Sequence, residues 1–310
     1  MEGRQVTDIV PTAGMSVDDL MRQLKESGGF TGRKLADAAD IVTEMFGKEG
    51  CFTFLSFPAC IMATGTRGVL VELAKRKLVD CIITTCGTLD HDLARTWMKY
   101  YHGDFNMDDA LLRREGINRL GNVLVPDESY GLILEERLAP MFDEILKDRD
   151  SISTSELIRE VGLRIDDERS LLHWCAKNEI PIIVPGITDG SFGSQLWMHW
   201  QTHRKLSVDL FGDEQVLSNI AFHADETGAL IIGGGISKHH VIWWNQFRGG
   251  LDYAVYMTTA VEYDGSLSGA QVREAVSWGK VKEQAQHVTV EGDATITLPF
   301  LVASVLERLG

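Results

Sequence analysis

Positive charge is scarce in this chain of 310 residues. Lysine and arginine together number 30, against 45 aspartates and glutamates, and the formal net charge is -15 at pH 7. A protein that binds nucleic acid needs basic patches to neutralise phosphates, so this balance argues against a nucleic-acid partner. The excess of acid is compatible with a cationic substrate or with a basic partner protein.

Cysteine is also sparse, and long apolar runs are missing. The five cysteines form no Cys-x-x-Cys pair and their number is odd, so we expect reduced thiols rather than disulfides. No run approaches the roughly 18 apolar residues that a membrane helix needs. Residues 1–5 lack the apolar core of a signal peptide. We therefore expect a cytoplasmic protein that has no membrane-spanning segment.

The common catalytic motifs are missing as well. The sequence contains no Gly-x-Ser-x-Gly elbow, no Walker loop, no Gly-x-Gly-x-x-Gly and no His-Glu-x-x-His. His199 and His203 are four residues apart on a predicted helix, which is a spacing that suits a metal pair. The residues between them supply no glutamate, and His91 has no second histidine–aspartate cluster to match it. We interpret the pair as part of a helix surface and expect no metal site.

What the chain does contain is a regular alternation of strand-like and helical segments. The run Cys81-Ile82-Ile83 is apolar at successive positions, which is typical of a parallel strand buried on both faces. Expected strands are residues 51–57, 79–85, 122–126, 181–185, 206–210, 229–232, 253–258 and 288–290. Expected helices are residues 65–77, 89–101, 131–148, two within 149–180, 191–203, 213–224, 238–247 and 295–309. This order predicts an α/β protein with a Rossmann-like parallel sheet and helices on both faces.

The first 48 residues differ from the rest because only helices are expected there. Ser16 is a suitable helix cap, since acids follow it in the first turn and Leu20 begins a helical apolar spacing. A second helix is expected over residues 31–46. The sequence contains no linker, repeat or low-complexity tract. We therefore expect a helical extension of residues 1–48, followed by a single compact domain of residues 49–310.

Four loops after predicted strands contain small residues, hydroxyls and acids. In a parallel sheet, ligands bind beyond the carboxyl ends of the strands, where these loops would gather. The glycines at 233–235 stand between a strand and a helix, so they also direct a helix N-terminus toward a phosphate. On this evidence alone, a tight strand-to-helix turn is the more common explanation of these glycines. The four loops are residues 84–88, 185–191, 233–240 and 258–269.

Residues 274–280, Glu-Ala-Val-Ser-Trp-Gly-Lys, indicate a second kind of chemistry. Lys280 follows Trp278 and Gly279, and a lysine amine is a nucleophile only when it is unprotonated. A dry aromatic wall would favour the neutral amine by desolvation. Gly279 would allow the backbone to approach a ligand closely. Considered alone, the stretch is weak evidence, because a lysine after an aromatic residue is usually an ordinary surface lysine.

Taken together, these stretches resemble the deoxyhypusine synthase family, from about Asp19 to the C-terminus. The most specific matching segments are residues 116–122, 188–191, 233–240, 252–256, 264–266, 268–270, 274–280 and 293–295. The resemblance implies a Rossmann-like fold of the deoxyhypusine synthase type. It also implies NAD as the cofactor and spermidine as the amine donor. The aminobutyl group would pass through an imine on an enzyme lysine to a lysine of the hypusine-carrying translation initiation factor.

The resemblance also assigns roles to individual residues. It makes Lys280 the imine-forming lysine and His239 the group that assists proton transfer. Trp278 would pack on the polyamine, and Glu274 would anchor an amine. The residues at or beside the NAD contacts would be Thr85, Asp189, Gly234, Thr259, Ala260, Ser266, Ser268, Asp293 and Ala294. The family is a homotetramer with sites built across a dimer interface, so the same assembly is expected here.

The chain departs from the family at the end of the site that holds the polyamine. Ser194 and Leu267 stand where the family typically has aspartates that bind amines of spermidine. Asp90 and His91 replace an acidic pair, and Ala59 and Cys60 replace polar residues near NAD. An unpaired buried ammonium is costly, so a serine and a leucine are not neutral exchanges. Asp90, Glu274 and Asp264 would have to supply the missing negative charge.

Three functions therefore stay open at the level of sequence. The first is deoxyhypusine synthesis from spermidine. The second is a related transfer that uses another amine, such as agmatine, or a small-molecule acceptor. The third is a non-catalytic NAD-binding subunit that assembles with an active paralogue. The joint presence of Glu274, Trp278, Lys280 and His239 favours an enzyme, because a scaffold needs none of them.

Overall fold

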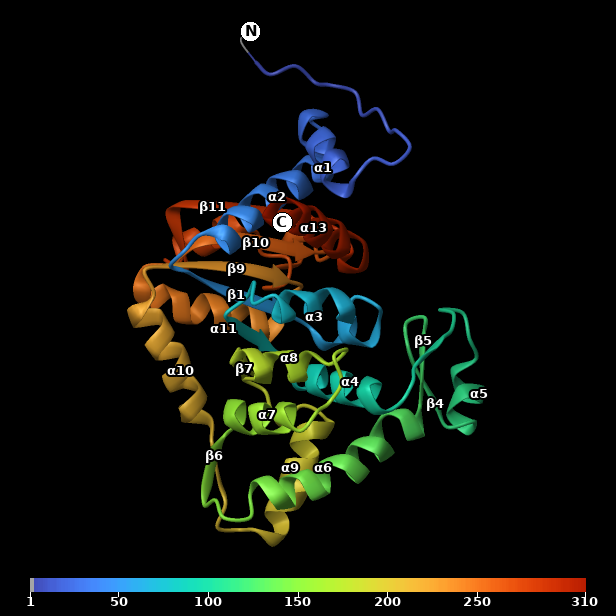
Figure 1. The fold of residues 1–310 in the computed structure, drawn as a ribbon. Helices are drawn as coiled ribbons and strands as arrows, with labels where there is room; N and C mark the ends of the chain where they lie inside the picture. Colours follow the sequence, from blue (N-terminus) through green and yellow to red (C-terminus); the bar gives the residue numbers. More distant parts are fainter. Residues whose placement is uncertain (1–2) are drawn as a thin grey trace. The chain divides into compact units, whose positions relative to one another are not determined.

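The computed structural model describes residues 3–310, and these form two compact units (Figure 1). The first unit combines the N-terminal segment through Phe57 with residues 218–310, and the second unit is residues 58–217. Helix α10 (Leu210–His223) spans the boundary in the sequence. This grouping differs from the division after residue 48 that the sequence suggested. The reason is that the N-terminal helices pack with the C-terminal helix of the same unit.

Four parallel strands form the centre of the first unit. They are arranged in the order β11-β10-β9-β1, with Leu55 opposite Leu230 and Leu230 opposite Val255. The strands are β1 (Cys51–Phe57), β9 (Glu226–Ile232), β10 (Leu251–Thr258) and β11 (Val281–Glu291). Successive residues such as Leu230 and Ile231 are fully buried, so both faces of these strands are covered.

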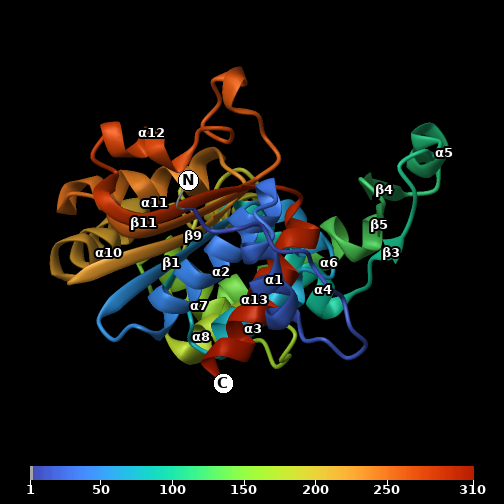
Figure 2. The ribbon, with the colours of Figure 1, turned by 90° about the horizontal axis from the view of Figure 1, so that it is seen from above.

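Helices cover both faces of these strands. Figure 2 shows α2 and α13 on one face, and α11 and α12 on the other. Asp18 of the first helix accepts hydrogen bonds from Ser304 and Arg308 of the last helix, which holds the two ends of the chain together. The helices are α1 (Val17–Glu26), α2 (Phe30–Gly47), α11 (Gly235–Asn245), α12 (Val272–Ser277) and α13 (Ala294–Leu309), with a 3-10 turn at each of Gln246–Arg248 and Glu262–Asp264.

The second unit contains the parallel strands β2 (Cys81–Thr84) and β7 (Ile182–Ile183), the last two in the six-strand order β11-β10-β9-β1-β2-β7. Its helices are α3 (Arg67–Lys75), α4 (Cys86–Trp97), α5 (Asp109–Arg114), α6 (Gly131–Ile145), α7 (Thr154–Leu163), α8 (Leu171–Asn178) and α9 (Ser191–Thr202), with 3-10 turns at Ala59–Ala63 and Asp127–Ser129. Both units therefore have parallel strands that alternate with helices, and the predicted α/β class is confirmed. No helix among residues 3–310 is long and apolar enough to cross a membrane.

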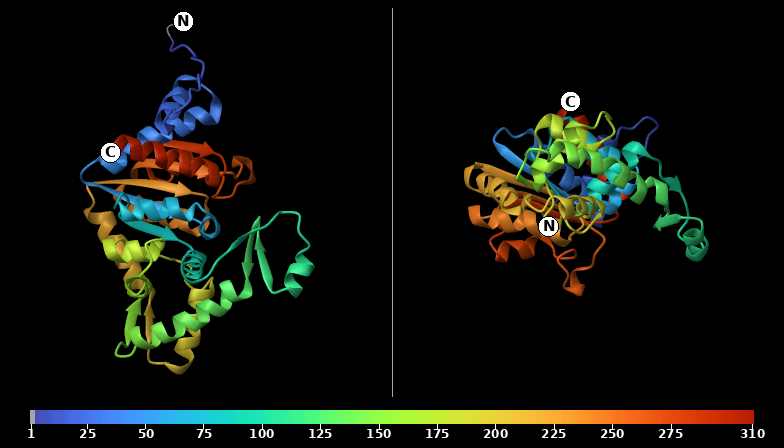
Figure 3. Two further views of the ribbon diagram at one scale, coloured as in Figure 1. Left: turned by 45° about the vertical axis from the view of Figure 1, so that its right-hand side comes forward. Right: turned by 90° about the horizontal axis from the view of Figure 1, so that it is seen from below.

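Two small sheets complete the second unit. One is an antiparallel sheet with the strand order β3-β5-β4. Together with α5, this sheet projects from the N-terminal end of α6 (Figure 3). Its strands are β3 (Tyr101–His102), β4 (Ile117–Leu120) and β5 (Val123–Pro126). The other sheet pairs β6 (Ser151–Ser153) with β8 (Ser207–Asp209). The strand expected near residues 206–210 is thus real, but it pairs with a short strand that the sequence did not predict.

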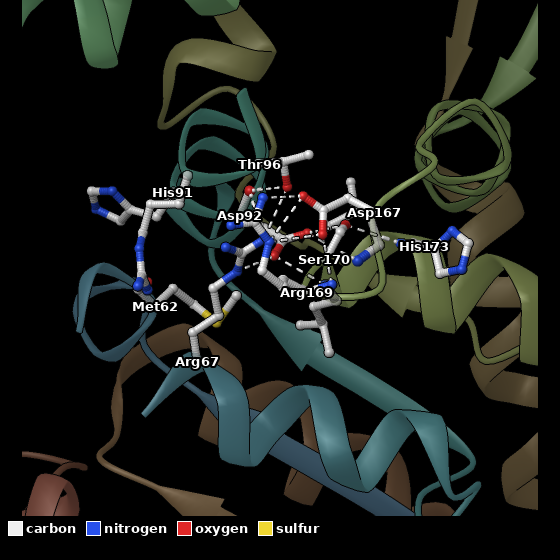
Figure 4. Close-up of polar contacts among 12 residues, drawn as sticks. Met62, Arg67, His91, Asp92, Thr96, Asp167, Arg169, Ser170 and His173 are labelled. Atoms are coloured by element: carbon white, nitrogen blue, oxygen red, sulfur yellow. Dashed lines mark hydrogen bonds and ion pairs between the residues drawn. The ribbon is translucent and has the colours of Figure 1, made fainter. Parts of the chain in front are cut away.

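A buried ion pair holds three helices of the second unit together (Figure 4). Arg67 of α3 donates to Asp92 of α4 at 2.7 Å, and both side chains are almost fully buried. The Asp92 carboxylate also accepts from the hydroxyl of Ser170 and from the backbone N–H groups of Leu171 and Leu172, at 2.7 to 3.0 Å. These contacts satisfy the N-terminus of α8, so the charge of Asp92 is fully compensated.

Candidate active site

The four residues predicted to carry catalysis all line one cavity of about 410 Å³ in the first unit. His239 comes from the first turns of α11, Glu274 lies on α12, and Trp278 and Lys280 follow α12 directly. Helix α12 itself was not predicted from the sequence. This helix has six residues, and Glu274 within it and Lys280 just after it both line the cavity.

Lys280 is buried between two indole rings. Its side chain is 8% exposed, and Nζ lies 5.3 Å from the ring centre of Trp278 and 6.0 Å from that of Trp243. Gly279 has a φ of 66°, a left-handed conformation that favours glycine and turns the chain so that Lys280 faces inward. The arrangement places the amine beside aromatic faces that can contact an alkyl chain or a cation.

His239 lies in the same cavity, half-buried, with its ring stacked on Trp243 at 5.7 Å. Burial lowers the pKa of His239, and the positive charge of Lys280 lowers it further. The imidazole is therefore neutral near pH 7, in which form one nitrogen can accept a proton. A proton acceptor close to an amine is the arrangement that imine formation and breakdown need.

Lys238 is a residue that the sequence analysis missed. It is 1% exposed, and its Nζ donates to the backbone carbonyls of Leu267 at 2.8 Å and Ala270 at 2.9 Å. Desolvation lowers the pKa of Lys238 to about 8, while the charge of Glu274 opposes that shift. The spacing of the buried residues Lys238, Val241 and Ile242 is the signal that could have placed this lysine on the inner face of α11.

Glu274 is the acidic residue among those that line the cavity. Leu267, at the position where an aspartate was expected, also lines the cavity. Its side chain is apolar, and its backbone carbonyl accepts the hydrogen bond from Lys238. Any ammonium bound inside the cavity would therefore face the carboxylate of Glu274. Trp278 is 66% exposed and forms an apolar rim beside it.

The loops expected to bind a nucleotide in this unit follow three neighbouring parallel strands. Gly234 follows β9, Thr259 and Ala260 follow β10, and Asp293 and Ala294 follow β11. The carboxyl ends of parallel strands meet at one edge of a sheet, so these residues gather there. The segment that contains Ser266 and Ser268 closes against them. A Cβ on Gly234 would lie 2.3 Å from the Cα of Ser268, so only glycine permits this approach.

Asp293 and Ser266 also form hydrogen bonds that stabilise the local structure. The Asp293 carboxylate accepts from the backbone N–H of Thr295 at 2.7 Å and caps α13. Ser266 donates its backbone N–H to Asp264 at 2.6 Å, which shapes the turn before Ser268. Asp264 is therefore occupied in that turn, which weakens the expectation that it supplies charge to an amine.

In the second unit, Thr85 precedes α4, and its hydroxyl accepts from the backbone N–H of Ala59 at 3.2 Å. Asp189 is exposed in the loop after β7. The hydroxyl of Ser194 donates to the carbonyl of Gly190 at 3.0 Å. The positions of Thr85 and Asp189, after β2 and β7, agree with the expected ligand-binding ends of these strands.

The carboxylate of Asp90 already makes three hydrogen bonds within the second unit, which the sequence did not indicate. It is fully buried and accepts from the N–H groups of Ser191 and Phe192, at 2.9 and 2.7 Å, and from the hydroxyl of Tyr130 at 2.8 Å. Burial raises its pKa, and these three hydrogen bonds act in the opposite direction. An amine bound by Asp90 would have to displace contacts that satisfy the start of α9.

Comparison with known sequences decides the family. The sequence model of deoxyhypusine synthase matches residues 19–305 of this chain. The chain belongs to the deoxyhypusine synthase family. A protein of Thermoplasma acidophilum described as a "Probable deoxyhypusine synthase" is 56% identical over 303 residues, covering 98% of this chain and 97% of its own. A relative from Sulfolobus acidocaldarius with the same description is 49% identical, covering 90% and 89%.

Solved structures of lower identity support the fold of this family member. A crystal structure described as a "putative deoxyhypusine synthase" from Entamoeba histolytica has a TM-score of 0.64 at 22% identity, covering 95% of this chain and 94% of the other. The ternary complex of AgrE with ornithine and NAD+ has a TM-score of 0.53 at 12% identity, covering 90% of this chain and 34% of that chain. At these identities the likeness concerns the fold alone.

Proposed function

We propose that this protein is an NAD-dependent aminobutyl transferase. In this proposal the aminobutyl group of spermidine passes through an imine on Lys280 to one lysine of the hypusine-carrying translation initiation factor. The observation that carries the proposal is that Lys280, His239 and Glu274 line one cavity of about 410 Å³ with two tryptophans. Family membership supports the same chemistry for these residues.

Each of these side chains has a separate task in the proposal. The carboxylate of Glu274 binds a terminal ammonium of the amine, and the indole of Trp278 packs along its methylene groups. Neutral His239 accepts the proton that the reacting amine loses. The Lys280 amine adds to the oxidised carbon, releases the rest of the polyamine as an amine, and holds the four-carbon unit as an imine.

NAD is the cofactor that we propose. When bound, it would supply the oxidant for the amine and, after transfer, the reductant for the imine. The residues that would hold it in the first unit are Gly234, Thr259, Ala260, Ser266, Ser268, Asp293 and Ala294. The close approach of Gly234 to Ser268 brings two of these residues together. Thr85 and Asp189 of the second unit are assigned to NAD by the family resemblance.

A transfer that uses another amine is the second candidate. The cavity offers the carboxylate of Glu274, while Leu267 lines it with an apolar side chain and Ser194 carries no charge. A donor with fewer ammonium groups than spermidine, such as agmatine, would need fewer acids. A small-molecule acceptor belongs to the same alternative, and a non-catalytic NAD-binding subunit is the remaining one.

Reductive trapping tests the proposal. The protein would be mixed with NAD and spermidine and reduced with borohydride, after which intact mass and the modified peptide would be read. A butylamine adduct on Lys280 that depends on NAD is the expected result. The matched control is Lys280→Arg, which keeps the charge but cannot form the adduct. An adduct with agmatine alone would support the second candidate, and no adduct with any amine would support the non-catalytic subunit.

The assembly and the setting are proposed on the same family basis. We expect a cytoplasmic homotetramer, whose mass would be four times the 34.5 kDa of one chain. Light scattering on the purified protein checks this expectation, because a monomer or dimer would be two- to fourfold lighter.

A further inference from the structure

His199 and His203, which the sequence analysis interpreted as part of a helix surface without a metal site, are joined in the second unit by an acid from another helix. His199 and His203 lie on α9, and Asp143 lies on α6, which packs beside it (Figure 1). One possible ligand atom from each residue lies within 4.8 Å of the other two. The two imidazole rings are parallel, with centres 4.0 Å apart. Neither the proposed reaction nor the NAD-binding loops use these residues.

The hydrogen bonds of His203 leave one ring nitrogen available. Its Nδ1 lies 3.0 Å from the carbonyl oxygen of His199 and 3.0 Å from the hydroxyl of Thr202; the hydroxyl can donate or accept, but the carbonyl can only accept. Nδ1 therefore carries the hydrogen in the neutral ring, and Nε2 carries the lone pair. An imidazole whose other nitrogen donates to a backbone carbonyl is the usual form of a metal-binding histidine.

His199 is held more firmly. Its side chain is 6% exposed and its ring lies edge-on to Phe142, while Nδ1 is 3.1 Å from the Asp143 carboxylate. Asp143, at 69% exposed, and the exposed His203 can rotate to adjust the geometry.

We propose that Asp143, His199 and His203 bind a divalent transition-metal ion of the zinc class. Two imidazoles and one carboxylate suit Zn²⁺, Ni²⁺ or Cu²⁺, whereas Mg²⁺ and Ca²⁺ prefer oxygen ligands alone. Zinc accepts such ligands at about 2.0–2.2 Å, so the three atoms must approach one another by roughly one ångström. Three protein ligands leave one coordination position for water. The ion would link α6 to α9.

The test is calorimetric titration of the full chain with zinc chloride after the chain has been treated with a chelator. Every variant would carry Cys60→Ser, so that this exposed thiol does not compete for the ion. We expect one ion per chain. His203→Ala and Asp143→Asn remove exposed ligands, so the fold should survive, and the affinity should fall by about tenfold or more in each. Cobalt in place of zinc should give visible absorption that both variants lose.

His223→Ala is the matched control. His223 also stands near the end of a helix and also contacts a carbonyl four residues earlier, that of Asn219, but it lies outside the cluster. This variant should bind zinc as tightly as the parent protein. The proposal is overturned if the parent protein binds no zinc, or if His203→Ala and Asp143→Asn bind it as tightly as His223→Ala.

Discussion

At the scale of single residues, the two lysines of the cavity have different surroundings. Lys238 is pinned by two carbonyl oxygens, whereas Lys280 lies between aromatic rings and makes no side-chain hydrogen bond within residues 3–310. A reactive amine must move and change its bonds during a reaction. Lys280 meets that requirement, and Lys238 instead holds the segment around Leu267 and Ala270 against α11.

Replacement of Lys238 should therefore affect stability more than replacement of Lys280. Lys238→Met leaves two buried carbonyls without a donor, and we expect a loss of about 1–3 kcal/mol in the free energy of unfolding. Lys280→Met should cost less, because it removes no hydrogen bond. Urea unfolding of both variants measures the difference, and equal stability would contradict the structural role of Lys238.

The same lysine should make stability depend on alkaline pH. Its pKa is lowered to about 8 in the folded state from an ordinary 10.5, so the unfolded chain binds more protons between these values. Stability attributable to Lys238 is therefore lowest below pH 8 and rises toward pH 10.5. The difference in unfolding free energy between wild type and Lys238→Met should grow over this window. A constant difference from pH 7 to 10 would be the contrary outcome.

His239 should set the acidic limit of activity. It accepts a proton in its neutral form, and burial together with Lys280 lowers its pKa. Activity should therefore persist below the ordinary histidine value of about 6.5 and fall only when the pH passes the lowered pKa. His239→Gln should lose about 10²–10⁴-fold in rate and lose this acidic limb. Measuring the rate against pH for the wild type and for His239→Gln tests this prediction. If the fall in rate at acidic pH persists in the variant, it is caused by a group other than His239.

At the scale of elements, the Arg67–Asp92 contact is where a small change should have a large effect. Asp92→Ala leaves a buried guanidinium and the start of α8 without their acceptor. We expect a loss of about 3–5 kcal/mol. The control is Asp109→Ala, which breaks an exposed pair with Arg119 and should change stability little. Similar unfolding midpoints for the two variants would argue against a structural role for Asp92.

The glycine turn after β9 should also be sensitive to a small substitution, and the property affected should be the affinity for NAD. Gly234→Ala places a Cβ 2.3 Å from the Cα of Ser268, so the segment beyond β10 must move. We expect NAD affinity, measured by calorimetry, to fall at least tenfold. Gly68→Ala is the control, because its Cβ would meet nothing within 4 Å. That variant should keep NAD binding. It should also gain roughly 0.5–1 kcal/mol of stability, because alanine is more stable than glycine within a helix by about that amount.

The sequence predicted the long elements from local patterns, and the family resemblance assigned Glu274, Trp278, Lys280 and His239, which line one cavity. Strands β1, β9 and β10 have continuous apolar runs, and residues 274–280 are a short contiguous motif. The two small sheets were largely missed, since their strands have two to four residues and no clear alternation. Asp143 could not be paired with His199 either, because nothing in the sequence shows that α6 packs against α9.

At the scale of the whole molecule, the net charge of -15 should assist binding of a cationic substrate. Raising the ionic strength from 0.1 M to 1 M shortens the Debye length from about 10 to about 3 Å and screens this attraction. We expect the KM for the amine to rise with salt while kcat changes little. NAD is an anion, so its affinity serves as the internal control and should not weaken in parallel.

The first unit is assembled from the two ends of the chain, and this has a consequence for its biosynthesis. Strand β1 ends at residue 57, but its partner β9 begins at residue 226. A ribosome adds about 5–20 residues per second, so β1 and the helices before it wait roughly 10–30 s for that partner. The second unit is contiguous and is completely synthesised during this interval. Nascent chains stalled before residue 226 should therefore present an apolar strand whose edge toward β9 is unpaired, which makes them substrates for chaperones.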